Sequence, residues 1–167
     1  QKMDRFSSDP AIALVKEQIK DLHRRGFEIG LHLHPQWSNA TFRDVRWVLD
    51  DREYNMCVLG KKRIAEIVNE ALSFIRNVLN DPRFTPVSFR AGNWLLQPTE
   101  QASIVLADAG IKIDSSVFKG GLQHYRKLDY RQALKNGFYW NFSRDVTTPT
   151  LEAPLIEVPI HTKMVPF

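Results

Sequence analysis

Apolar and polar residues alternate along residues 26–35, a stretch that ends in two histidines and a proline. A period of two is typical of a β-strand with one apolar face, and Pro35 predicts the end of the strand because proline donates no backbone hydrogen bond. Residues two apart in a strand project to the same side. We therefore expect His32 and His34 to project together, where two ring nitrogens can bind one metal ion. The alternative is a pair of solvated loop histidines.

Three further stretches carry apolar residues at helical spacing. The first begins at Asp9-Pro10, since Asp suits the N-cap and Pro the first helical position, and it ends before Gly26, a residue typical of helix C-caps. The other two predicted helices span residues 62–79 and 98–110. Residues 36–62 are polar and aromatic, and a connection of this length is more often functional than a plain loop.

Short apolar runs predict the remaining strands. These strands cover residues 86–90, 111–114, 138–142 and 155–160, and a short helix is predicted at 130–135. Helices and strands thus alternate, which favours an α/β fold with a parallel sheet or barrel and helices outside it. At 167 residues the chain has the length of one domain with a substantial core.

Composition and charge exclude several classes of protein. The net charge is +4, but basic residues are scattered among acidic ones, which favours a mixed solvated surface and gives no indication of nucleic-acid binding. A single cysteine, Cys57, excludes an internal disulfide and a cysteine-based zinc cluster. The sequence contains no apolar run of ~20 residues and no signal peptide, so we expect a soluble protein, cytoplasmic if no signal peptide precedes this chain.

The candidate chemical groups fall at the carboxyl ends of predicted strands. They are His32, His34, Arg90, Asp114 and His161. In α/β barrels this edge carries the active site, so we expect the five side chains to share one site. A guanidinium at a strand end needs an anionic partner, and Asp114 is either that partner of Arg90 or the cap of the turn that follows it.

Four segments resemble motifs of the polysaccharide deacetylase domain, the NodB-homology domain of carbohydrate esterase family 4. Residues 26–32 (Gly-Phe-Glu-Ile-Gly-Leu-His) are similar to its second motif, and residues 89–94 (Phe-Arg-Ala-Gly-Asn-Trp) to its third. Residues 114–117 resemble the stretch after the next helix and strand, and residues 157–161 (Glu-Val-Pro-Ile-His) resemble the fifth motif. The order and approximate spacing of the motifs agree from residue 9 to residue 161.

This resemblance implies a distorted (β/α) barrel of about seven strands, forming one deacetylase-like catalytic domain over residues 1–167. It implies a bacterial hydrolase that removes an N-acetyl or similar acyl group from an amino sugar or polysaccharide, using a divalent metal ion, usually zinc. In that case His32 is a metal ligand, Arg90 braces the catalytic aspartate and His161 is the general acid.

Several other residues are candidates for contact with a sugar substrate. They are Trp37, Asn93, Trp94 and Asp114, and Trp140 is a further tryptophan that could stack on a sugar ring. For the tryptophans the alternative is packing in the core or at its rim. His124 lies in a stretch without a clear element and could contribute a metal ligand.

The chain departs from the family's pattern at three points. Gln36 stands where the family has its second histidine ligand, so in our interpretation His34 replaces that ligand. Gly92 stands where the third motif has proline. The paired aspartates of the first motif are absent, and Asp4 and Asp9 form no such pair, so we expect the barrel to be truncated at its N-terminal strand. The alternative is an inactive or metal-independent relative that binds carbohydrate or acts on another C–N bond.

Overall fold

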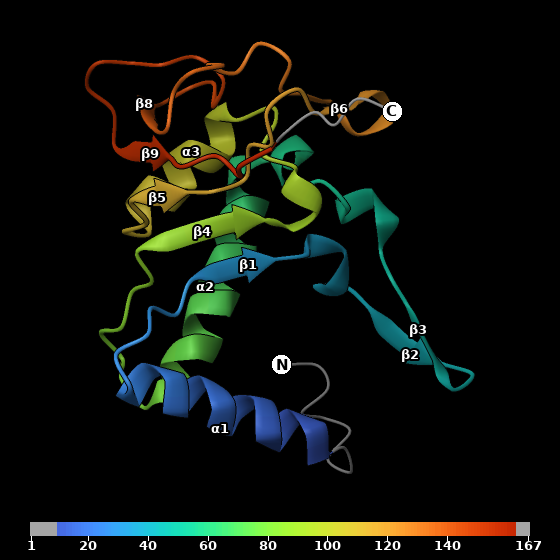
Figure 1. Cartoon of the computed structure of the whole chain (residues 1–167). Helices are drawn as coiled ribbons and strands as arrows, with labels where there is room; N and C mark the ends of the chain where they lie inside the picture. The colour runs from blue at the N-terminus through green and yellow to red at the C-terminus, as the bar shows by residue number, and fades with distance from the viewer. Residues whose placement is uncertain (1–9, 163–167) are drawn as a thin grey trace.

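A five-stranded sheet organises the protein, whose computed structural model describes residues 10–162 (Figure 1). The strands follow the order β1 (Leu31–Leu33), β4 (Ser88–Ala91), β5 (Ile113–Asp114), β9 (Leu155–Glu157) and β8 (Trp140–Phe142). The first four are parallel, and β8 runs antiparallel to β9. The predicted α/β fold with a parallel sheet is therefore confirmed.

Three α-helices accompany the sheet, close to where the sequence predicts them. They are α1 (Pro10–Arg24), α2 (Lys61–Leu79) and α3 (Glu100–Asp108). The predicted C-cap Gly26 has φ +83°, which allows the amide of Phe27 to donate to the carbonyl oxygen of Leu22 and close the end of α1. Asp9, the predicted N-cap, lies outside the described residues. None of the helices within residues 10–162 is long and apolar enough to cross a membrane.

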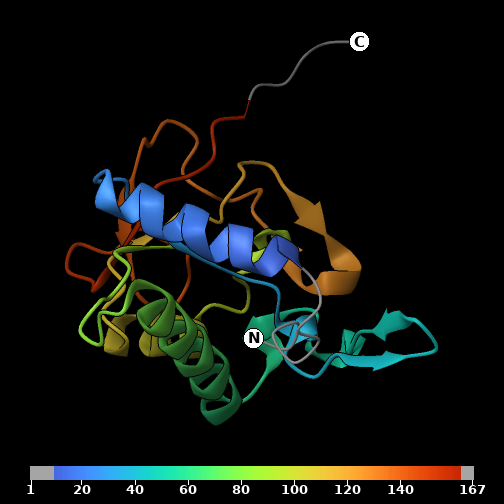
Figure 2. The same cartoon turned by 90° about the horizontal axis from the view of Figure 1, so that it is seen from below.

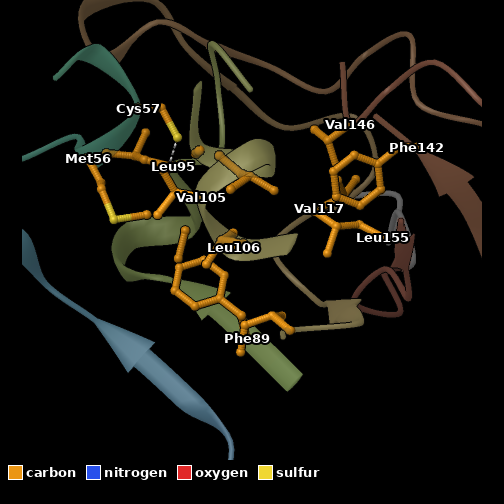
Figure 3. Close-up of a cluster of buried hydrophobic side chains, with 14 of the residues drawn as sticks. Met56, Cys57, Phe89, Leu95, Val105, Leu106, Val117, Phe142, Val146 and Leu155 are labelled. Carbon is orange, nitrogen blue, oxygen red and sulfur yellow. Dashed lines mark hydrogen bonds between the residues drawn. The ribbon is translucent and has the colours of Figure 1, made fainter. Parts of the chain in front are cut away.

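The core lies between the sheet and the helices. α2 packs against both α1 and α3, and α1 lies beyond β1 at the end of the sheet (Figures 1 and 2). Figure 3 shows Phe89 of β4, Leu106 of α3 and Leu155 of β9 among the buried side chains of this core. Each side chain of this size stabilises the fold by about 1.5–3 kcal/mol when it is fully buried.

The segment between β1 and α2 is more structured than the predicted loop 36–62. Its elements are the 3-10 helix η2 (Pro35–Trp37), the hairpin of β2 (Thr41–Arg43) and β3 (Arg46–Val48), and the 3-10 helices η3 (Asp51–Glu53) and η4 (Met56–Val58). The hairpin projects from the body of the protein (Figures 1 and 2). Asp44 and Val45 form its turn with φ of +48° and +62°, a conformation usually signalled by glycine or asparagine. Because Val45 gives no such signal, the sequence did not predict the hairpin.

Three other predictions need correction. The predicted helix at 130–135 is wrong: turns follow a hairpin of β6 (Leu122–Gln123) and β7 (Leu128–Asp129), which is joined by the 3-10 helix η6 (His124–Arg126). The predicted strand at 26–35 is reduced to β1, since the backbone just after α1 closes the helix end. The predicted strand at 155–160 ends at Glu157, because Pro159 cannot continue the ladder.

Candidate functional site

Two imidazoles face each other where β1 ends. His32 is exposed on β1 and His34 follows the strand half-buried, with their Nε2 atoms 3.1 Å apart. Nδ1 of His32 lies 3.0 Å from the carbonyl oxygen of Arg90. A carbonyl only accepts, so Nδ1 of His32 carries a proton, and in the neutral imidazole Nε2 then carries a lone pair. The structure thus brings the two predicted ligands together and orients the first of them.

The spacing of the two Nε2 atoms suits a shared proton or a shared metal ion. Two nitrogens that each lie about 2.0–2.1 Å from a tetrahedral zinc ion are about 3.3 Å apart. Burial lowers the pKa of His34, and the neighbouring His32 lowers it further. The lowered pKa favours the neutral imidazole, which is the form that binds a metal ion. Nδ1 of His32 donates to a backbone carbonyl oxygen, and histidines that bind metal ions usually make such a contact through their other ring nitrogen.

Gly92 gives His34 its place. A side-chain carbon on this residue would overlap the carbonyl oxygen of Leu33 and lie 2.9 Å from Cγ and Nδ1 of the His34 ring. The backbone of the β4 end therefore passes directly beneath the imidazole. Glycine at this position has a physical reason, since only glycine leaves room for His34 at this distance.

A cavity of about 530 Å³ opens beside the imidazole pair, between α1, α2 and the end of β1. Its walls include His32, His34, Trp37 and Trp47, with Ile67 and Phe74 from α2. The rings of Trp37 and Trp47 meet edge to face with centroids 5.9 Å apart, and Trp37 is 45% exposed. Aromatic faces beside polar groups suit the apolar side of a sugar ring.

Arg90 has a different partner from the one expected. Its guanidinium donates to the carbonyl oxygen of Ser115 at 2.9 Å and to Ser115 Oγ at 3.0 Å. Asp114 instead faces inward and caps its own turn, accepting from the amide and the hydroxyl of Ser116 at 2.8 Å each. Of the two readings of Asp114, the turn cap is the one that the structure contains.

Asp114 also belongs to a buried pair of carboxyl groups that the sequence reading missed. Its register partner Glu157 lies on β9, and both residues are 0% exposed. The two residues are register partners on neighbouring parallel strands, and burial raises the pKa of both carboxyl groups, that of Glu157 to about 11. One carboxyl group therefore keeps its proton at neutral pH. The available signal was a glutamate two residues after Leu155, on the buried face of an apolar strand.

The remaining candidates lie elsewhere. His161 is exposed and lines a separate cavity of about 440 Å³ with Lys119 and Phe138, so the structure does not bring it to the imidazole cavity. His124 lines a third cavity. Trp140 is buried, and its indole nitrogen donates to the carbonyl oxygen of Val146 at 2.7 Å, so this tryptophan packs in the core and does not present a sugar platform.

Asn93 and Trp94 follow Gly92 directly. Both have left-handed backbones, with φ of +56° and +60°, which is uncommon for residues with side chains. The Asn93 amide nitrogen is buried and has no hydrogen-bond partner among residues 10–162. Trp94 is 43% exposed and meets Phe118 edge to face. Such strain is typical of functional sites, and it keeps both residues as candidates for substrate contact.

His32 and His34 do not belong to a larger cluster of metal-binding side chains within the described residues. Across residues 10–162, no group of three or more His, Cys, Asp or Glu side chains is placed to hold a metal ion. The pair therefore fits two positions of a tetrahedral site, and other ligands would complete it. Comparison with known proteins adds no relative: no family model matches the chain, and no curated protein matches it.

Proposed function

We propose that this protein is a metal-dependent hydrolase that removes an N-acetyl or similar acyl group from an amino sugar or polysaccharide. The observation that carries the proposal is the imidazole pair, with its Nε2 atoms 3.1 Å apart beside an aromatic cavity. The resemblance to polysaccharide deacetylases over residues 26–32, 89–94 and 157–161 supports the reaction class. The same resemblance supports a distorted (β/α) barrel of about seven strands as the full architecture.

His32 and His34 would hold the metal ion. A zinc ion bound there would polarise the acyl carbonyl group and bring the pKa of a bound water to about 7. The chain's own contribution is to keep His34 neutral by burial and to fix the His32 ring through the Arg90 carbonyl oxygen. Trp37 and Trp47 would pack against the sugar and exclude water from the reacting bond.

The roles proposed for His161 and Arg90 rest on the resemblance to polysaccharide deacetylases. His161 would protonate the leaving amine, which requires the substrate to reach from the imidazole cavity to the separate cavity of His161. Arg90 would brace an aspartate. Its side chain lies exposed at the end of β4, on the same edge as the histidines, which leaves it accessible to such a partner.

Zinc binding tests the proposal most directly. The zinc content of the purified chain is measured after reconstitution, together with His32→Ala and His34→Ala, and His124→Ala serves as the control histidine outside the cavity. We expect about one equivalent of zinc in the wild type and in the control. We expect zinc to be lost in both cavity variants, because His32 and His34 are the two histidines that line this cavity within the described residues. Zinc retained by His32→Ala would overturn the assignment. Acetate release from N-acetylated glucosamine oligomers then tests the reaction.

The second candidate function is carbohydrate binding without metal chemistry, or action on another C–N bond. It is favoured by one observation, that residues 10–162 offer two clustered ligands and not three. A wild type that binds no zinc but binds N-acetylated glucosamine oligomers, with loss of binding in Trp37→Ala, would favour this function over the first.

A further inference from the structure

The buried carboxyl pair is sealed from solvent, yet it touches the loop that holds the histidine site. Ser116 Oγ donates to Asp114 Oδ1 at 2.8 Å, and the Ser116 amide donates to Oδ2 at 2.8 Å. The Val117 amide donates to Glu157 Oε1 at 3.0 Å. The backbone of residues 115–117 therefore wraps around both acids.

The same loop reaches β4, the strand that orients His32. Ser116 Oγ accepts from the amide of Ala91 at 2.9 Å, and Ser115 accepts from the Arg90 guanidinium. The carbonyl oxygen of Arg90 accepts from Nδ1 of His32. A continuous series of contacts thus runs from the acid pair through Ser116 to the end of β4 and on to the imidazole.

The buried carboxyl pair has no basic side chain beside it in the described part of the chain. Within residues 10–162, no lysine, arginine or histidine forms an ion pair with Asp114 or Glu157. The other titratable groups that face Asp114 are the thiol of Cys57 on η4 and the phenol of Tyr130 after β7, and burial raises the pKa of both, so they stay neutral. Two adjacent buried carboxylates would repel each other strongly, so the pair is stable while at least one of the two carboxyl groups holds a proton.

We propose that the buried Asp114–Glu157 pair is the positioning element of the histidine site: through Ser116 it fixes the end of β4, whose Arg90 carbonyl oxygen holds His32 in the tautomer that leaves a lone pair on Nε2 for a ligand. The inference rests on the proposed function in that His32 is taken as a metal ligand. The acids themselves touch no substrate. Loss of the proton that one carboxyl group holds would leave two buried negative charges side by side. Water could reach these charges only if the 115–117 loop moved.

The two acids respond differently to amide substitution. Glu157→Gln keeps the contacts, because its amide NH₂ can donate to Asp114 while its oxygen accepts from Val117. Asp114→Asn disrupts them, because both Asp114 oxygens accept from Ser116 and an NH₂ group cannot. Both substitutions replace a carboxyl group by an amide of similar size, but only Asp114→Asn removes an acceptor that Ser116 needs.

The experiment reads the tautomer of His32 by long-range ¹H–¹⁵N NMR on the metal-free full chain. We expect the Nδ1–H tautomer in the wild type and in Glu157→Gln. We expect a shift toward the Nε2–H tautomer in Asp114→Asn and in Ser116→Ala, and Ser116→Ala provides the test if Asp114→Asn does not fold. Ser103→Ala is the control, since Ser103 is an equally buried serine whose hydroxyl bonds only the Glu100 carbonyl oxygen. Unchanged Nδ1–H in folded Ser116→Ala would overturn the proposal.

A pH titration and a zinc titration complete the test. As the pH approaches 11, the wild type should lose the Nδ1–H tautomer, while Glu157→Gln should keep it; identical behaviour of the two would also overturn the proposal. Zinc affinity should fall about 10-fold or more in Ser116→Ala and stay unchanged in Ser103→Ala. If the wild type binds no zinc but the tautomer responds as expected, the hydrolase proposal fails and the positioning role stands.

Discussion

Two pairs of ionisable groups lie near the carboxyl ends of different parallel strands of one sheet, and they differ in their access to solvent. The imidazoles of His32 and His34 stand at the β1 end, one exposed and the other half-buried beside a cavity. The carboxyl groups of Asp114 and Glu157 stand between β5 and β9 without any exposure. Only the histidine pair is accessible to a ligand from solution, so access separates the candidate binding pair from the buried pair.

The two pairs also limit stability at opposite ends of the pH scale. Burial raises the pKa of Glu157 to about 11, so its contribution is present at low pH and is lost as the pH rises from its ordinary value toward 11. Burial lowers the pKa of His34, so its contribution is present above the ordinary histidine pKa and is lost as the pH falls. The sealed pair thus weakens the fold in alkali and the open pair in acid.

Removing one member of the sealed pair should have the largest effect. Glu157→Ala leaves the buried Val117 amide without an acceptor and opens a cavity at a fully buried position, at a cost of about 3–5 kcal/mol in the free energy of unfolding. Urea denaturation measures this cost. Glu152→Ala, at an exposed glutamate, is the control and should stay within about 0.5 kcal/mol of the wild type. A loss below 1 kcal/mol for Glu157→Ala would contradict the role given to the pair.

Filling the space beneath the open pair should have the next largest effect. Gly92→Ala places a methyl group against Leu33 and the His34 ring, which should cost about 1–3 kcal/mol and displace the imidazole, so that zinc binding falls. Gly60→Ala is the control, because a side-chain carbon there meets no atom within 4 Å. Urea denaturation and zinc titration check both variants, and normal zinc binding by Gly92→Ala would show that His34 needs no close support.

The pH dependence of the sealed pair should be visible as a smaller change. Glu157→Gln removes the titration, so its melting temperature relative to that of the wild type should rise by a few degrees between pH 6 and pH 7. Thermal unfolding followed by circular dichroism at several pH values measures this difference. A constant difference across the range would mean that Glu157 does not hold its proton in the folded state.

Removing one imidazole of the open pair should have the smallest effect on the fold. His34→Ala should change the free energy of unfolding by about 1 kcal/mol or less in the absence of metal, because the residue is half-exposed and its ring has solvent on one side. The same variant should bind no zinc. A large loss of stability in metal-free His34→Ala would assign the open pair a structural role in place of a binding one.

The sequence by itself determined the local features of the protein. Helical periodicity placed α2, and Gly26 marked the end of α1, because capping depends on neighbouring residues alone. The i, i+2 spacing of His32 and His34 predicted that the two rings could meet, and the structure places them in contact. These features need only residues that are close along the chain.

The tertiary structure decided what depends on distant segments. Asp114 and Glu157 are 43 positions apart in the sequence, and only the register of β5 with β9 makes them partners. That register gives Asp114 to Glu157 and leaves Ser115 as the partner of Arg90, which no local pattern contains. His161 stands at the end predicted for its strand, yet the chain directs it to another cavity. Burial and strand order arise only when the sheet assembles, which is why the sequence indicated the histidine pair and named Asp114 but missed its pairing with Glu157.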